Sequence, residues 1–158
     1  MEIRQATPPD KSWIKGFLIK NWGDTIMVVR GKPHDLLQYP CMMAANCSGN
    51  YSGLLIWKNV EQAAEILAIG AAVPNQGVGG ALLDALLGHL SKLKIQRLSV
   101  ITTNDNLSAL RFYQRRGFRL TALDIGAMDK ARKIKPLIPL VGEFGIPIRD
   151  ELELGLGL

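Results

Sequence analysis

The sequence contains few of the residues that form disulfides or bind metal ions. Only two of its 158 residues are cysteine, Cys41 and Cys47, and only two are histidine, His34 and His89. The six-residue offset between the cysteines fits no common zinc pattern, and no second pair completes a site. We therefore predict no metal centre, and two reduced cysteines that pack as small hydrophobic side chains.

Long apolar runs are also missing. No stretch reaches the roughly 18 apolar residues that a membrane-spanning helix needs. The start of the chain, Met1 to Arg4, lacks the basic and apolar parts of a secretion signal. We expect no membrane partner and a cytoplasmic location. The length and the 47% hydrophobic content fit a single domain over residues 1–158 with a real core.

The formal net charge of +5 suggests an anionic partner, and the basic residues gather in two segments. One segment contains Arg111, Arg115, Arg116 and Arg119, and the other contains Lys130, Arg132, Lys133 and Lys135. Nucleic acid or a cofactor with several phosphates would explain such clusters. Because basic and aromatic residues do not interleave and no nucleic-acid module is visible, we expect no nucleic-acid partner.

Hydrophobic periodicity predicts a mixed α/β fold. Alternation and turn residues predict strands over 3–6, 25–30, 42–46, 51–57 and 64–71, the last three forming an antiparallel meander, and a helix that opens at 8–10 and ends near Trp22. After residue 77 the period changes to 3.6, with Leu82, Leu83, Leu86, Leu87, Leu90 and Leu93 on one helical face.

The second half continues with strands and helices in turn. We predict a strand over 98–103, a helix over 106–116, a strand over 118–123 and a short helix over 127–133. A C-terminal extension begins near residue 126. Its even-numbered apolar residues, Ile146 to Leu154, predict a final edge strand, followed by frayed residues 155–158.

A glycine-rich turn joins a buried strand directly to the leucine-rich helix. Gly77, Gly79 and Gly80 leave the backbone N–H groups at the helix start open to an anion, which the helix dipole also favours. A P-loop would need Gly-Lys before Ser or Thr, and a dinucleotide fingerprint would need glycine in place of Leu82. An ordinary turn before a helix remains the alternative.

A second segment, Asn106 to Phe118, reads NLSALRFYQRRGF. Asn106 and Tyr113 are nearly two helical turns apart and share one face, and the small Ala109 between them leaves room for a thin ligand. Asn106 could bind that ligand or cap its own helix, and Tyr113 could be a core aromatic.

These two segments resemble the GNAT superfamily of N-acetyltransferases. The second matches every fixed position of the pattern N-x-x-A-x-x-x-Y-x-x-x-G-F, and Gly77 to Gly79 match the end of Q/R-x-x-G-x-G/A. Pro74 stands at the Q/R position and departs from the pattern. The runs TTNDN and GIPIRDELEL are similar to a bacterial subgroup without an established acceptor.

The resemblance implies a fold and a cofactor. It implies a mostly antiparallel central sheet flanked by helices and splayed between the family's fourth and fifth strands, here those ending near Ala71 and Thr103. Small residues at 70–72 suit a bulge there. It implies acetyl-CoA as cofactor. The acetyl group would be transferred when an amine of a small molecule or peptide attacks the thioester directly. The cofactor-binding residues that it implies are Ile69, Ala71, Gln76, Gly77, Val78, Gly79, Gly80, Ala81, Asn106 and Tyr113.

The resemblance also implies catalytic roles. The phenol of Tyr113 would protonate the departing thiolate, and Glu65 matches a position where some relatives place a general base. Glu65 could equally be a surface carboxylate. Because Pro74 interrupts the motif, a non-catalytic acyl-CoA sensor is the alternative function. The acceptor stays unidentified. Candidates to line the acceptor side of the site are Trp22, His34 and Tyr39. The final strand would permit a homodimer.

Overall fold

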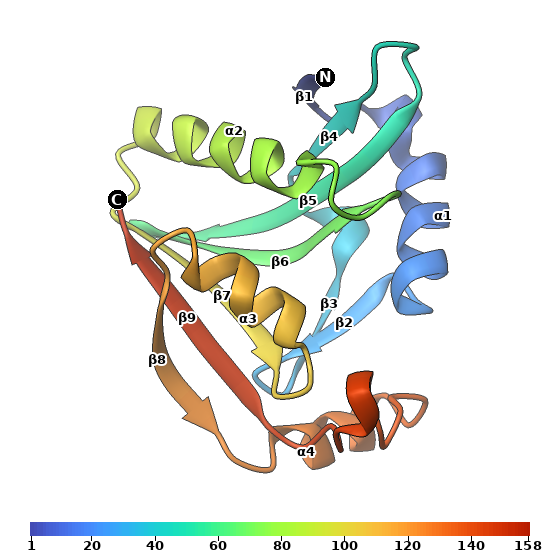
Figure 1. Ribbon diagram of the computed structural model, residues 1–158, viewed down its shortest axis with the longest axis vertical. Helices are drawn as coiled ribbons and strands as arrows, with labels where there is room; N and C mark the ends of the chain where they lie inside the picture. Colours follow the sequence, from blue (N-terminus) through green and yellow to red (C-terminus); the bar gives the residue numbers. More distant parts are fainter.

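The computed structural model describes all residues, 1–158 (Figure 1). Its strands are β1 Glu2–Gln5, β2 Ile26–Val29, β3 Lys32–Asp35, β4 Cys41–Ala45, β5 Tyr51–Val60, β6 Ala63–Ala71, β7 Arg97–Thr103, β8 Arg119–Asp124 and β9 Glu151–Gly157. Its α-helices are α1 Lys11–Trp22, α2 Val78–Lys92, α3 Leu107–Gln114 and α4 Ala127–Ile134. The predicted order of strands and helices is therefore confirmed except for β3, which was not predicted.

Seven strands form one sheet in the order β1-β4-β5-β6-β7-β9-β8, and β2 and β3 form a separate hairpin. The meander β4-β5-β6 is antiparallel as predicted. The pair β6 and β7 is parallel, whereas the other neighbours in the sheet are antiparallel. Because a parallel pair needs a crossover, α2 connects these two strands over one face of the sheet.

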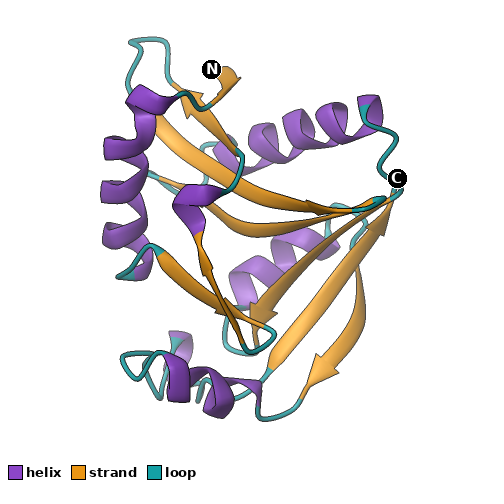
Figure 2. Ribbon diagram, turned by 180° about the vertical axis from the view of Figure 1, so that it is seen from behind, coloured by secondary structure: helices purple, strands orange, loops and turns teal.

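Two hydrophobic cores lie on opposite faces of the sheet. One packs the leucines of α2 and Tyr113 of α3 against the strands, and the other packs Ile14, Phe17 and Leu18 of α1. Figure 2 shows α1 and the β2–β3 hairpin on the near face, with α2 and α3 beyond the sheet. Alternate strand residues therefore point to different cores, as the pleat requires.

The sheet opens between β6 and β7. The two strands pair only from Ala63 to Ile66 and from Arg97 to Val100, although β6 continues to Ala71 and β7 to Thr103. Figure 1 shows the two strands diverging beyond this point. This confirms the splay. The bulge is not at residues 70–72, which pair regularly through Ala71; it is at Leu67, which has no partner between the pairs Ile56↔Ala68 and Trp57↔Ile66.

The prediction of a final edge strand was wrong. Strand β9 lies inside the sheet between β7 and β8, and β8 is the outer strand. Residues 155–158 are not frayed, because Gly155 to Gly157 pair with β7 and the N–H of Leu158 donates to Gln96. Alternation identifies which side chains share a face, but it carries no information on strand order.

No helix of the chain has the length and apolar character that a bilayer crossing needs.

Candidate active site

A cavity of about 770 Å³ opens where β6 separates from β7. Its wall comes from the end of β6, the turn before α2, the first turn of α2, and α3. The lining residues are Ile69, Gly70, Ala71, Pro74, Asn75, Gln76, Gly77, Val78, Gly79, Gly80, Asn106, Ser108, Ala109, Arg111, Phe112, Tyr113, Arg115 and Arg116. The lining thus contains three arginines and no carboxylate, so the cavity suits an anion.

The first turn of α2 presents free amides to this cavity. Gly77 precedes the helix with a φ of +76°, a left-handed conformation that glycine adopts without steric cost. The first bond of the helix runs from the N–H of Ala81 to the carbonyl of Gly77. The N–H groups of Val78, Gly79 and Gly80 precede that bond, so they have no partner within the helix.

Arg116 adds a positive charge to the same end of α2. Its guanidinium stacks on the ring of Phe112 at 3.9 Å from the centroid, and its Nη1 donates to the Phe112 carbonyl at 3.2 Å. A Cβ added at Gly80 would lie 2.8 Å from Nη2 of Arg116. The missing side chain of Gly80 therefore lets the guanidinium lie against the start of α2.

Asn106 and Tyr113 begin and end the face of α3 that lines the cavity. The side chain of Asn106 accepts from the N–H of Ala109 at 3.1 Å, so Asn106 acts as the helix cap, which was one of its two predicted roles. Tyr113 is 2% exposed and packs against Phe118, with ring centroids 5.1 Å apart. Burial raises the pKa of the Tyr113 phenol.

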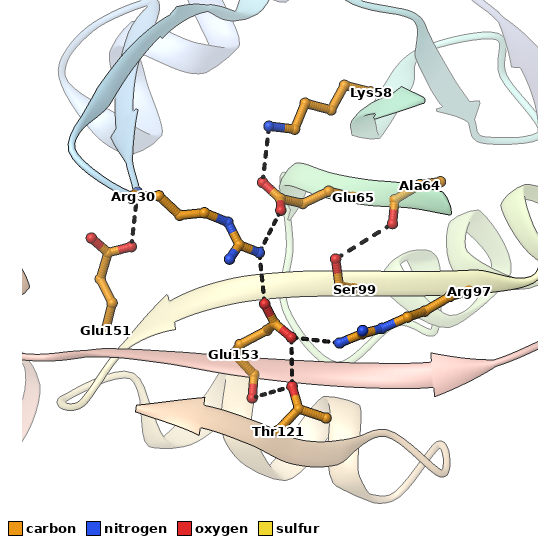
Figure 3. A network of polar contacts seen from close by, with 9 residues as sticks. All are labelled: Arg30, Lys58, Ala64, Glu65, Arg97, Ser99, Thr121, Glu151 and Glu153. Carbon is orange, nitrogen blue, oxygen red and sulfur yellow. Dashed lines mark hydrogen bonds and ion pairs between the residues drawn. The ribbon is translucent and has the colours of Figure 1, made fainter. Parts of the chain in front are cut away.

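Glu65 lies outside this cavity, on the sheet face that the β2–β3 hairpin covers (Figure 3). It is 6% exposed, and its Oε2 accepts from Nη2 of Arg30 at 2.8 Å. Its Oε1 lies 3.5 Å from Nζ of Lys58 and has no hydrogen-bond partner. Glu65 is therefore not the surface carboxylate of the alternative interpretation.

Arg30 connects Glu65 to two acidic residues of β9. Its Nη2 also lies 2.7 Å from Oε2 of Glu153, and its backbone N–H donates to Glu151 at 3.4 Å. Glu151 is 4% exposed, and burial raises its pKa. The hairpin tip is thus attached by charge to the sheet beside the opening between β6 and β7.

The structure brings together most of the residues that the sequence singled out. All the predicted cofactor residues line the cavity except Ala81, whose N–H is used within α2. Arg111, Arg115, Arg116 and Phe112 line it as well and were absent from the predicted site. The arginine cluster was the available signal, since the sequence had already suggested a phosphate-bearing partner for it.

The three candidates for the acceptor side, Trp22, His34 and Tyr39, lie on the side of the sheet that α1 covers. The ring of Trp22 packs against the backbone of β6, where a Cβ at Gly70 would stand 2.9 Å from Cη2. Nδ1 of His34 lies 2.8 Å from the Tyr39 hydroxyl. Trp22 therefore contacts Gly70, a strand residue that lines the cavity.

Comparison with known proteins adds independent information. Residues 13–118 match the Acetyltransferase (GNAT) family. The uncharacterized protein YxbD of Bacillus subtilis strain 168 is 38% identical over 154 residues, which cover 98% of this chain and 97% of that protein. YdhI of the same organism is 35% identical over 142 residues, covering 90% and 89%.

Solved acetyltransferases have the same architecture. The IAA acetyltransferase from Bacillus cereus ATCC 14579 has a TM-score of 0.77 at 21% identity, covering 99% of this chain and 100% of that one. A GNAT family acetyltransferase from Elizabethkingia anophelis with acetyl-CoA bound has a TM-score of 0.71 at 21% identity, covering 99% and 97%. At these identities the likeness establishes the fold.

Proposed function

Because the chain belongs to the GNAT family of acetyltransferases, we propose that it transfers the acetyl group of acetyl-CoA to the amine of a small molecule or peptide. One observation carries the proposal: the open amides of α2 and three arginines face a single cavity beside the splayed strands. The assembly that we propose is a homodimer.

The residues around the cavity fit coenzyme A. The amides of Val78, Gly79 and Gly80 would bind the pyrophosphate, as free N–H groups at a helix start bind phosphates elsewhere. Arg116, held on Phe112, would add a charged hydrogen bond. Pro74 has no N–H, so it offers no amide at the position where the family pattern has Gln or Arg, and Gln76 lines the cavity instead.

Strand β6 supplies backbone groups for the thinner part of the cofactor. Beyond Ile66 its β7 side has no strand partner, so backbone groups of Ile69 and Ala71 are available to the pantetheine amides. When bound, the cofactor supplies an acetyl thioester. A backbone N–H in this stretch would stabilise the oxyanion formed on attack, a role worth about 3 kcal/mol.

Tyr113 is the proposed acid. The side chain of Tyr113 lines the cavity. Because the pKa of its phenol is raised, the hydroxyl group stays protonated at neutral pH. A protonated phenol can donate to the departing thiolate. Because Tyr113 is otherwise enclosed by Phe118 and the α2 core, its position is fixed before the cofactor binds.

Glu65 is the proposed base. A lysine-type amine has a pKa of about 10.4 and an α-amino group about 8, so the acceptor must lose a proton to attack. Glu65 occupies one of the last paired positions before β6 and β7 separate, and its Oε1 has no hydrogen bond. We propose that the acceptor approaches from the sheet face that the β2–β3 hairpin covers. Glu65 would remove the proton of the amine through a water molecule.

Release of free thiol from acetyl-CoA across a panel of amines tests the function. The panel would contain amino acids, diamines, amino sugars and short peptides, and coenzyme A binding would be measured in parallel. Thiol release with at least one amine supports the proposal. Binding without turnover on any amine supports the non-catalytic sensor, and failure to bind coenzyme A contradicts both.

A further inference from the structure

Strand β8 is an open edge of the sheet. It pairs with β9 on one side only, and all six of its residues, Arg119 to Asp124, are exposed. An edge strand presents a row of unpaired backbone N–H and C=O groups to other chains. Natural edges are protected by charged side chains, especially lysine, by proline, by bulges or by a covering loop. The segment RLTALD contains no lysine or proline and has one bulge, and exposure of every side chain shows that no loop covers it.

A bulge at the centre of β8 gives the strand an unusual distribution of side chains. Leu120 pairs with Leu154 and Ala122 with Glu153, so Thr121 is the extra residue. Since paired residues share a face, Leu120 and Leu123 both point to the α3 side. They are 53% and 58% exposed.

The two charged ends of β8 point to the other face. Arg119 pairs with Gly155 and Asp124 with Glu151, and both partners belong to the face of β9 that carries Glu153. If Thr121 is left out, the strand is symmetric about Ala122. Leu120 and Leu123 flank Ala122 on one face, and the opposite charges of Arg119 and Asp124 stand at the two ends on the other face. This order is self-complementary when the strand is reversed.

We infer that β8 is the docking surface for a second copy of this chain, paired antiparallel about a two-fold axis at Ala122. In this register Arg119 lies opposite Asp124 of the second copy, and Leu120 lies opposite Leu123 of the second copy. Both ion pairs and both leucine pairs form at once, because a two-fold interface repeats each contact. The inference does not depend on the proposed reaction.

The charges at β8 have no partner within the chain, which favours this occupant. Neither Arg119 nor Asp124 forms an ion pair in the monomer. Asp124 lies instead beside the buried Glu151, and its negative charge adds to the rise in the pKa of Glu151. An arginine from a second copy would offset this local excess of acid.

Charge reversal at the two ends of β8 tests the pairing. We expect wild type to sediment as a dimer that dissociates on dilution, because one strand pair buries less than a standard interface of about 1,600 Å². Arg119→Asp places Asp opposite Asp124, and Asp124→Arg places Arg opposite Arg119. Each single variant should weaken the dimer about tenfold or more, since two attractive pairs become repulsive. The double variant R119D/D124R restores both pairs and should dimerise like wild type.

The control is Lys15→Asp, a charge reversal on the exposed surface of α1, which should leave dimerisation unchanged. Far-ultraviolet circular dichroism and coenzyme A binding would show that each variant is folded. A wild-type monomer at all concentrations would overturn the inference. A dimer that tolerates both single variants, or a double variant that stays as weak as the singles, would overturn it as well.

Discussion

Gly80 and Arg116 approach so closely that a Cβ at Gly80 would stand 2.8 Å from Nη2 of Arg116. The contact joins the first turn of α2 to the turn that follows α3, so the free amides of one segment and the guanidinium of another face the same cavity. This convergence of positive groups on one point is the basis of the proposed cofactor site.

Gly80→Ala tests that convergence. The new methyl group displaces the flexible end of Arg116 and leaves the backbone in place, so the fold should persist. We expect the dissociation constant for coenzyme A to rise about tenfold, the effect of weakening one charged hydrogen bond. The matched control is Gly88→Ala in the same helix, where an added Cβ meets nothing within 4 Å. It should stabilise the protein by about 0.5–1 kcal/mol without changing affinity.

Tyr113→Phe removes the proposed acid and retains the packed ring. We expect kcat to fall about tenfold or more, within the range for general acid catalysis, with little change in coenzyme A affinity measured by calorimetry. Because burial raises the pKa of Tyr113 above its usual value near 10, wild-type kcat should show no loss from its ionisation up to about pH 10. A variant as fast as wild type would exclude Tyr113 as the acid.

Glu65→Gln and Glu153→Gln separate a catalytic carboxylate from a structural one. Both residues accept from Nη2 of Arg30, but only Glu65 is the proposed base. We expect Glu65→Gln to lower kcat about 100-fold and Glu153→Gln to change it by less than about twofold, with some loss of stability from the broken ion pairs. Equal losses of kcat in both variants would assign Glu65 a structural role.

Asp10 gives the fold a dependence on acid pH. It is 4% exposed and accepts from Arg4, from Tyr51 and from the N–H of Thr7. The ion pair with Arg4 and the other hydrogen bonds lower its pKa far below the usual range. Its contribution to stability is therefore complete above about pH 3.9, the pKa of an unfolded aspartate, and declines as the pH falls further toward the folded value.

Urea unfolding of Asp10→Asn at two pH values measures this effect. The variant should be clearly less stable than wild type at pH 7, and the difference should shrink below pH 3. The control is Asp84→Asn, a change on the exposed face of α2 that should have no effect at either pH. A difference that stays the same at both pH values would show that the ionised Asp10 is not the source of the stability.

Local signals in the sequence predicted the elements that form the cavity. The 3.6 period of the leucines, the glycines before them and the asparagine at the start of α3 each act within a few residues, so the existence and the starts of α2 and α3 could be predicted. The end of α3 was placed at residue 116, two residues beyond the observed Gln114. Gly77, Asn106 and Tyr113 line the cavity for that reason.

Contacts between distant segments could not be predicted in the same way. Arg30 meets Glu65 and Glu153 only because the β2–β3 hairpin crosses the sheet, and no periodicity encodes that crossing. Strand β3 contains Pro33, which argues against a strand, yet the hairpin accommodates it opposite Val28 at a free edge. The position of β9 between β7 and β8 depends on the whole sheet rather than on its own alternation.

An amide NMR titration tests the central claim most directly. Coenzyme A and pantetheine would be added in turn to ¹⁵N-labelled protein, since pantetheine lacks the pyrophosphate. We predict that coenzyme A shifts the amide signals of Val78, Gly79 and Gly80 most strongly and that pantetheine leaves them almost unchanged. If coenzyme A leaves these three signals in place, or shifts them no more than pantetheine does, the helix start does not bind the cofactor.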